Sequence, residues 1–252
     1  MKCGLVSISF RENTPEEIIE AAAGAGLDCI EWGSDVHLRA DDISRAKEIK
    51  RRTEEAGLEM PSYGTYIGLQ KLDLTELKKC LKMADLMEMQ TLRIWPPDDK
   101  KPDFSSEEYK EYVRSCRLVA DKAKEYDKLI CLECHQGVLT DDYQTTLRFI
   151  HDVNRENLKM YWQPNQFKSF EYNLKSAKEL SPLVTNIHVF NWKEMDRFPM
   201  SQGEKEWKEY AQQFKQTNCQ NIYMLEFMYN NSISVVKQEA DSLRGILGEV
   251  YL

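Results

Sequence analysis

Short apolar segments alternate with longer amphipathic segments eight times along this chain of 252 residues. A short apolar run is typical of a buried parallel strand, whereas apolar residues that recur every three or four positions are typical of a helix packed on a sheet. Eight such units in roughly 250 residues is the usual size of a (β/α)8 TIM barrel. No Pro-, Gly- or Ser-rich linker divides the chain. We therefore predict an α/β fold in which residues 1–252 form a single barrel domain.

The alternation places each element along the chain. The predicted strands cover residues 3–9, 28–32, 59–64, 91–95, 129–134, 158–163, 185–190 and 221–227. The predicted helices cover residues 15–25, 43–56, 74–87, 106–126, 143–153, 170–180, 204–216 and 233–248.

Three of the predicted strands carry a polar side chain late in an apolar run. Side chains on a strand alternate between its two faces, so Glu133 lies opposite the face of its apolar neighbours. The same parity sets His188 apart from Ile187 and Val189, and Glu226 apart from Leu225. In the sixth strand, Trp162 has the opposite parity to Gln163 and is predicted to face the helices. The polar side chains should all face the interior of the barrel.

Every strand of such a barrel points its carboxyl end at one mouth, so these side chains become neighbours. Glu133, His188 and Glu226 should lie together there, with Gln163 beside them. A set of carboxylates and an imidazole suits a divalent ion such as Mn²⁺, Mg²⁺ or Zn²⁺. For any one of these residues alone, an ion pair with a Lys or Arg is the alternative.

Composition excludes several classes of function. Acidic residues outnumber basic ones by 42 to 34, and the basic ones are scattered over amphipathic helices, which disfavours nucleic acid as a partner. No signal-like start and no apolar run of about 18 residues occurs, so a soluble, cytoplasmic protein without membrane contact is expected. Seven cysteines without regular spacing fit reduced thiols.

Several motifs resemble those of the xylose isomerase-like TIM barrel family, the sugar phosphate isomerase/epimerase group whose fold is shared with endonuclease IV. They are AGLDCIEW at residues 25–32, LRIW at 92–95, ECH at 133–135, His188, Gly203 with Trp207, and LEF at 225–227. The resemblance runs nearly from end to end. The endonuclease branch is disfavoured, because a multi-metal nuclease needs more than the four histidines present here.

The resemblance implies one divalent metal ion, either Mn, Mg, Co or Zn. Family members commonly hold it with Glu, Asp, His and Glu from strands five to eight. Here Glu133, His188 and Glu226 match, whereas Gln163 stands in the place of the Asp. Gln163 still offers a neutral carbonyl oxygen but removes one negative charge. The expected metal ligands are therefore Glu133, Gln163, His188 and Glu226.

The same resemblance implies an isomerase or epimerase of a keto-sugar or related polyol ketone. The reaction would be proton transfer through a metal-stabilised enediolate, with Glu133 and Glu226 as the catalytic pair. A lyase or dehydratase that acts on a sugar or inosose would use the same enolate. A non-catalytic sugar-binding barrel is a third alternative, because the Asp of the sixth strand is missing.

Five further residues are substrate-binding candidates: Arg93, Trp95, His135, Asn165 and His37. Each of three has an ordinary structural alternative. Arg93 would otherwise form an ion pair with Glu133, His135 would cap its own loop, and His37 would be a solvated loop residue. The partner is expected to be a small-molecule sugar, and the resemblance suggests a homo-oligomer.

Overall fold

The computed structural model describes residues 1–217 and 220–251, and its centre is a closed barrel of eight strands. Around the barrel the order is β1, β10, β7, β6, β5, β4, β3 and β2, and neighbouring strands pair in parallel. The strands are β1 (Lys2–Val6), β2 (Cys29–Gly33), β3 (Ser62–Gly68), β4 (Thr91–Trp95), β5 (Leu129–Glu133), β6 (Leu158–Trp162), β7 (Val184–Val189) and β10 (Ile222–Leu225). The predicted (β/α)8 fold is confirmed.

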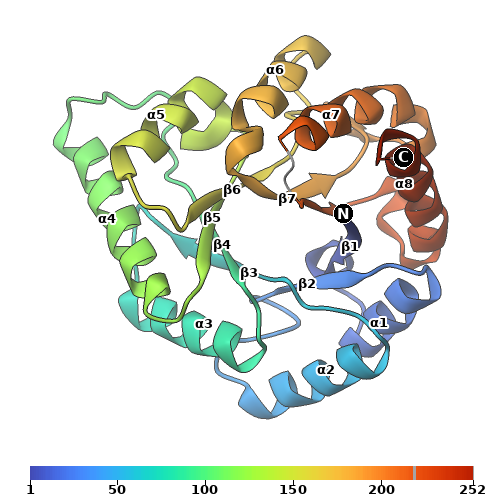
Figure 1. Cartoon of the computed structure of the whole chain (residues 1–252). Coiled ribbons are helices and arrows are strands. Elements are labelled where there is room, and N and C mark those ends of the chain that lie inside the picture. The colour runs from blue at the N-terminus through green and yellow to red at the C-terminus, as the bar shows by residue number, and fades with distance from the viewer. Residues whose placement is uncertain (218–219, 252) are drawn as a thin grey trace.

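In the part of the chain that the structure describes, eight helices form an outer ring around the strands (Figure 1). They are α1 (Pro15–Gly24), α2 (Ile43–Glu55), α3 (Leu74–Leu86), α4 (Glu107–Lys124), α5 (Tyr143–Val153), α6 (Phe170–Leu180), α7 (Glu204–Gln216) and α8 (Val236–Tyr251). A polar side chain caps the first turn of six of them, which satisfies backbone N–H groups that the helix leaves free. These caps are Thr14, Asp42, Asp73, Ser106, Asp142 and Ser169. Among the described residues, no helix combines the length and the apolar sequence needed to cross a membrane.

The predicted boundaries differ most at the third strand. The prediction was 59–64, but β3 begins at Ser62 and continues to Gly68. Glu59 makes only an isolated bridge to Cys29, and Pro61 has no N–H to donate to a ladder, so regular pairing starts after it. The first strand is shorter than predicted, because residues 7–10 form a 3₁₀ turn, η1.

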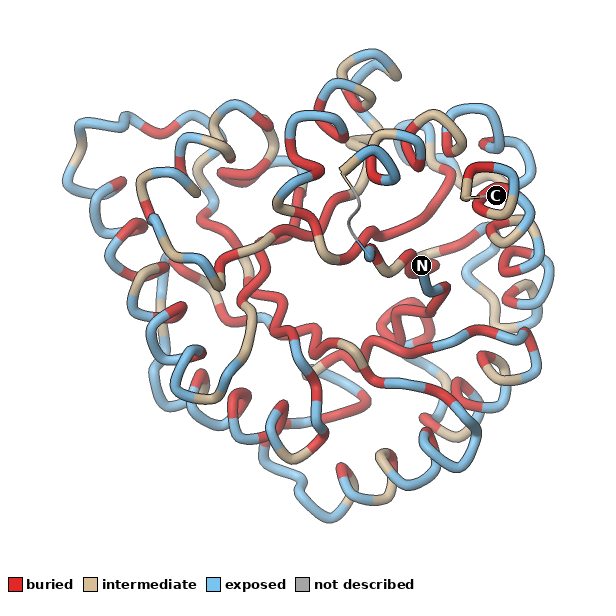
Figure 2. Tube along the Cα trace, viewed as in Figure 1, coloured by how far each residue is buried: buried red, intermediate tan, exposed pale blue. Residues whose placement is uncertain are grey.

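Buried residues concentrate along the barrel strands and on the inward faces of the helices (Figure 2). Trp162 illustrates this layer: it packs on Trp207, Tyr210 and Phe214 with ring centroids 5.2 to 6.2 Å away. Its predicted orientation toward the helices is confirmed. A smaller apolar cluster comprises Val6, Ile8, Cys131, Tyr161 and Met224. The barrel is therefore filled with side chains rather than open.

A buried acid on α8 supports the segment that follows the seventh strand of the barrel. Glu239 is 1% exposed and accepts a hydrogen bond from the backbone N–H of Met200 in η4 (Met200–Gly203) at 3.0 Å. Its other oxygen has no hydrogen-bond partner. Burial raises the pKa of Glu239, against the smaller opposing effect of the Met200 hydrogen bond.

We predict that Glu239→Gln stabilises the protein at neutral and alkaline pH. The folded state binds the Glu239 proton more tightly than the unfolded chain, so this acid costs stability as pH rises through its folded-state pKa. Urea unfolding at about pH 8 should show a gain on the order of 1 kcal/mol that vanishes at about pH 4. Glu20→Gln, which changes an exposed glutamate of α1, is the control. A loss of stability at pH 8 would contradict this account.

Candidate metal centre and active site

A cavity opens at the carboxyl ends of the strands, which is where barrels of this kind place their ligand sites. Seven of the residues singled out in the sequence line it: Arg93, Trp95, Glu133, His135, Gln163, Asn165 and Glu226. His188 is fully buried and contacts three of them. The structure thus brings eight of the predicted site residues together.

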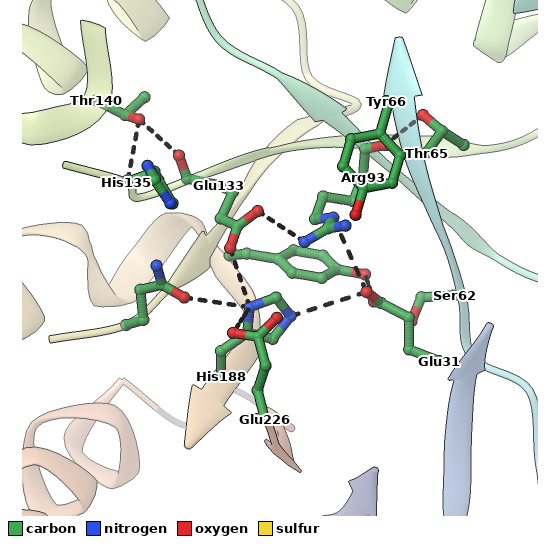
Figure 3. Close-up of polar contacts among 12 residues, drawn as sticks. Glu31, Ser62, Thr65, Tyr66, Arg93, Glu133, His135, Thr140, His188 and Glu226 are labelled. Carbon is green, nitrogen blue, oxygen red and sulfur yellow. Dashed lines mark hydrogen bonds and ion pairs between the residues drawn. The ribbon is translucent and has the colours of Figure 1, made fainter. Parts of the chain in front are cut away.

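Three side-chain oxygens converge on one nitrogen of His188. Oε1 of Glu133, Oε1 of Gln163 and Oε2 of Glu226 each lie 3.2 Å from His188 Nδ1 (Figure 3). The glutamates and the histidine come from strand ends, and Gln163 directly follows β6. The parity of the strands is what turns all four side chains inward.

These separations fit the donor set of a divalent cation. Metal–ligand bonds of about 2.1 Å place adjacent donors about 3.0 Å apart in an octahedron and about 3.4 Å apart in a tetrahedron. The observed 3.2 Å lies between these values. One ligand atom from each of Glu133, His188 and Glu226 can be chosen so that all lie within 4.8 Å of one another. The three separations from Nδ1 therefore match those expected around a small divalent ion.

Charge also favours a cation here. Three buried carboxylates, those of Glu31, Glu133 and Glu226, lie within 4.0 Å of His188. The buried guanidinium of Arg93 pairs with the first two of them. With His188 neutral, negative charges exceed positive ones by two in this group. Burial alone would lower the pKa of His188, but these carboxylates outweigh it and raise the pKa well above its usual value. A divalent ion would balance the surplus.

Arg93 on β4 holds one of the two glutamates. Its Nη1 donates to Oε2 of Glu133 at 2.7 Å, so the ion pair expected as the alternative role of Arg93 is present. Burial would raise the pKa of Glu133, but Arg93 and His188 outweigh it and lower that pKa to about 2. Glu133 is therefore ionised, and its Oε2 is already hydrogen-bonded to Arg93.

Glu226 is differently placed. It lines the cavity, and its recorded polar contact is with His188. It directly follows β10, and its backbone N–H donates to the carbonyl of Val189 at 3.0 Å, which continues the pairing of β10 with β7. Of the two predicted catalytic carboxylates, Glu226 has the freer side chain.

The loop after β5 is folded back onto the strand. The hydroxyl of Thr140 donates to the carbonyl of Glu133 at 2.5 Å and accepts from the N–H of His135 at 3.3 Å. The ring of His135 lies 4.8 Å from that of Trp95, and its Nδ1 lies 2.8 Å from the carbonyl of Gln136. His135 therefore both braces its loop and presents a ring to the cavity.

Asn165 is engaged by its own loop. Its amide donates to Oδ1 of Asp141 at 2.9 Å, and its oxygen accepts from the N–H of Phe167 at 3.0 Å. Asp141 also lines the cavity and accepts from the N–H of Gly137 at 3.0 Å. Asn165 thus fixes the loops that follow β5 and β6, and its predicted contact with substrate stays a prediction.

His37 is the one predicted site residue that the structure does not bring to the mouth cavity. It is buried beside Pro15 and Arg45 in a separate small cavity, and its Nε2 lies 3.2 Å from the carbonyl of Asn13. It is therefore not the solvated loop residue of the alternative prediction either. The path of the segment after β2 places His37 in that separate cavity, and strand periodicity does not determine this path.

Sequence reasoning missed two further groups. Glu31, on β2, is buried beside His188, and its parity between Ile30 and Trp32 carries the same inward signal as that of Glu133. Arg197 belongs to a hairpin of β8 (Trp192–Lys193) and β9 (Asp196–Arg197). Its guanidinium lies 4.5 Å from the ring centroid of the cavity residue Trp192. No sequence signal predicts this loop contact.

Comparison with known proteins finds relatives over nearly the whole chain. A curated relative, 3-dehydroshikimate dehydratase of Bacillus anthracis, is 23% identical over 95% of both chains. The crystal structure of the probable 3-DHS dehydratase AsbF from Bacillus anthracis superimposes with a TM-score of 0.82 at 20% identity, covering 96% of this chain and 98% of that one. An IOLI protein with a bound zinc atom gives 0.81 at 16% identity over 99% of each chain. An L-ribulose 3-epimerase gives 0.77 at 12%, over 99% and 95%.

At these identities the solved structures establish the fold. The family is established by the sequence model described as xylose isomerase-like TIM barrel, which matches residues 19–246. That range holds every predicted site residue. The chain belongs to the xylose isomerase-like TIM barrel family.

Proposed function

We propose that this protein is a divalent-metal-dependent isomerase or epimerase of a keto-sugar or related polyol ketone. The observation that carries the proposal is the convergence of Glu133, Gln163 and Glu226 on His188 Nδ1 at 3.2 Å, beneath a cavity lined by polar and aromatic side chains. Because Gln163 points its carbonyl oxygen at the same nitrogen, the missing Asp does not remove a donor from the site. This weighs against a non-catalytic barrel.

The two glutamates have unequal roles in this proposal. A bound divalent ion would stabilise the negative charge that develops on the oxygens of an enediolate. Glu226 removes the proton from the carbon beside the carbonyl, since its side chain is the less engaged. Glu133, which Arg93 keeps ionised in the resting site, is the weaker base. It returns a proton to the opposite face only after it has taken one from solvent, and Glu226 then releases its own proton to solvent.

The cavity walls suit a hydroxylated ring or chain. Trp95 and Trp192 offer aromatic faces for the apolar side of a sugar, and His135 lies beside Trp95 as a hydrogen-bonding group. Arg197 lies behind this wall, with its guanidinium 4.5 Å from the ring centroid of Trp192, and holds that ring in place. We assign binding of the substrate to these wall residues and proton transfer to Glu133 and Glu226.

A dehydratase of a hydroxy-ketone is the second candidate. Its first step is the same, but the enolate is not reprotonated. Instead the bond to a β-hydroxyl group breaks, and that group takes up the proton held by Glu226 and leaves as water. The Arg93–Glu133 pair favours it, because one free carboxylate suffices for elimination. The curated 3-dehydroshikimate dehydratase relative favours it as well.

Product mass separates the two candidates. The metal-loaded protein should be incubated with a panel of keto-sugars and with 3-dehydroshikimate, and each product should be analysed by mass spectrometry. We predict a product of unchanged mass from a keto-sugar. A product that has lost one water would assign the dehydratase, and no conversion of any of these ketones would contradict both candidates.

A second prediction concerns Glu226→Gln. The change removes the base while it keeps the volume and one oxygen, so the fold should persist and turnover should fall at least about 100-fold. Exchange of the substrate proton with deuterated solvent, followed by NMR, reports on the abstraction step for either product. Glu20→Gln on the outer face of α1 serves as the control. Near-normal exchange in Glu226→Gln would refute the role given to this residue.

A third prediction concerns Gln163→Asp. The substitution restores a charged oxygen beside His188 Nδ1, so calorimetric titration should show tighter Mn²⁺ binding. Gln166→Asp, on the same loop, is a control that also adds one negative charge at the cavity. Equal Mn²⁺ affinity for Gln163→Asp and the parent protein would mean that position 163 does not hold the metal.

A further inference from the structure

Glu31 is a fully buried acid that the proposed chemistry leaves unused. It is 0% exposed and lies on β2, across the barrel from β6. Its Oε2 accepts hydrogen bonds from the hydroxyls of Ser62 at 2.8 Å and Tyr161 at 2.7 Å. The carboxylate is thus held between two strands and cannot turn freely. A buried charge is costly, so its neighbours should indicate why it is there.

The other oxygen of Glu31 faces the cations of the site. Oε1 lies 3.8 Å from Nε2 of His188 and 3.9 Å from Nε of Arg93 (Figure 3). Glu31 Oε1, His188 Nε2 and Arg93 Nε are all buried without a hydrogen-bond partner. They are one another's polar neighbours, so Glu31 interacts electrostatically with both residues that hold Glu133.

The barrel wall is shaped to leave room for this arrangement. A Cβ atom at Gly64 on β3 would lie 2.8 Å from Glu31 Oε1 and 3.2 Å from Nη2 of Arg93. The first distance is too short for any real side chain, and the atom it meets is a fixed carboxylate oxygen. A residue other than glycine would therefore displace the Glu31 carboxylate from its position between His188 and Arg93.

Glu31 faces the nitrogen of His188 that points away from the converging oxygens. Its Oε1 lies beside Nε2, whereas Glu133, Gln163 and Glu226 converge on Nδ1. A divalent ion held at Nδ1 would take the place of a proton on that nitrogen. Glu31 would then hold the remaining proton on Nε2 and keep the ring in its orientation.

Glu31 also supplies a negative charge that the neutral side chain of Gln163 does not. With Gln163 neutral, Glu133 and Glu226 alone against Arg93 would leave a surplus of one negative charge around His188. Glu31 raises the surplus to two, the charge of a divalent ion. We propose that Glu31 is a positioning residue of the metal centre, which orients His188 through Nε2 and supplies the negative charge that Gln163 lacks. The inference rests on the proposed metal-dependent function.

Calorimetric titration with Mn²⁺ tests this role without reference to turnover. Glu31→Gln keeps the size and the hydrogen-bonding shape of the side chain but removes its charge, and Mn²⁺ should bind about 10- to 100-fold more weakly. Glu239→Gln is the matched control, since it neutralises a glutamate that is equally buried but lies on α8. It should bind Mn²⁺ as the parent protein does.

Rescue separates the electrostatic role from a purely structural one. The double variant Glu31→Gln/Gln163→Asp moves the charge from β2 to the loop after β6. It should bind Mn²⁺ at least about tenfold more tightly than Glu31→Gln does. Thermal unfolding checks that each variant is folded. If Glu31→Gln does not fold, Glu31→Asp takes its place, because it draws the charge back from His188 and should also weaken binding.

The outcomes distinguish this inference from the proposed function. Parent-like Mn²⁺ affinity in folded Glu31→Gln, or a double variant no better than Glu31→Gln, would overturn the role of Glu31 and leave the function untouched. Weakened binding with rescue, but no conversion of any ketone, would sustain Glu31 and refute the function. Absence of Mn²⁺ binding by the parent protein would overturn both.

Discussion

The site depends on a buried surplus of negative charge. Glu31, Glu133 and Glu226 lie inside the barrel against the single guanidinium of Arg93. Uncompensated charges in a low-dielectric interior are costly. Either a neighbouring side chain must therefore take up a proton, or the site must bind a cation. The raised pKa of His188 is the response of the protein alone, and a divalent ion would satisfy the same charges more completely.

The closed parallel barrel makes this concentration of charge possible. Each strand contributes one or two inward side chains near its end, and the apolar layer between strands and helices fixes their positions. Arg93 contacts Glu133 and lies near Glu31, so its guanidinium and these two carboxylates form one connected set. Outside it, Trp95 and His135 stay partly exposed to the cavity, where a substrate can reach them. The charged residues thus lie at the bottom of the site, and the side chains proposed to recognise a substrate lie around the cavity above them.

Strand periodicity carried most of what could be predicted from the sequence. It predicted the barrel, the inward position of Glu133, His188 and Glu226, and the outward position of Trp162, because buried strands leave little freedom in side-chain direction. Glu31 carried the same signal but was not assigned a role, since its partners come from strands distant in sequence. His37 and Arg197 lie on loops, whose paths depend on local contacts that periodicity does not encode.

The central claim is that the oxygens around His188 Nδ1 bind a divalent ion. Elemental analysis of freshly purified protein, before and after chelation and re-addition of Mn²⁺, tests it most directly. Glu226→Ala is the informative variant, because the polar contact it removes is the one with His188. We expect about one equivalent of Mn, Mg, Co or Zn in the parent protein and a strongly reduced content in the variant. No bound metal in the parent protein even after Mn²⁺ is added, or equal metal in both proteins, would contradict it.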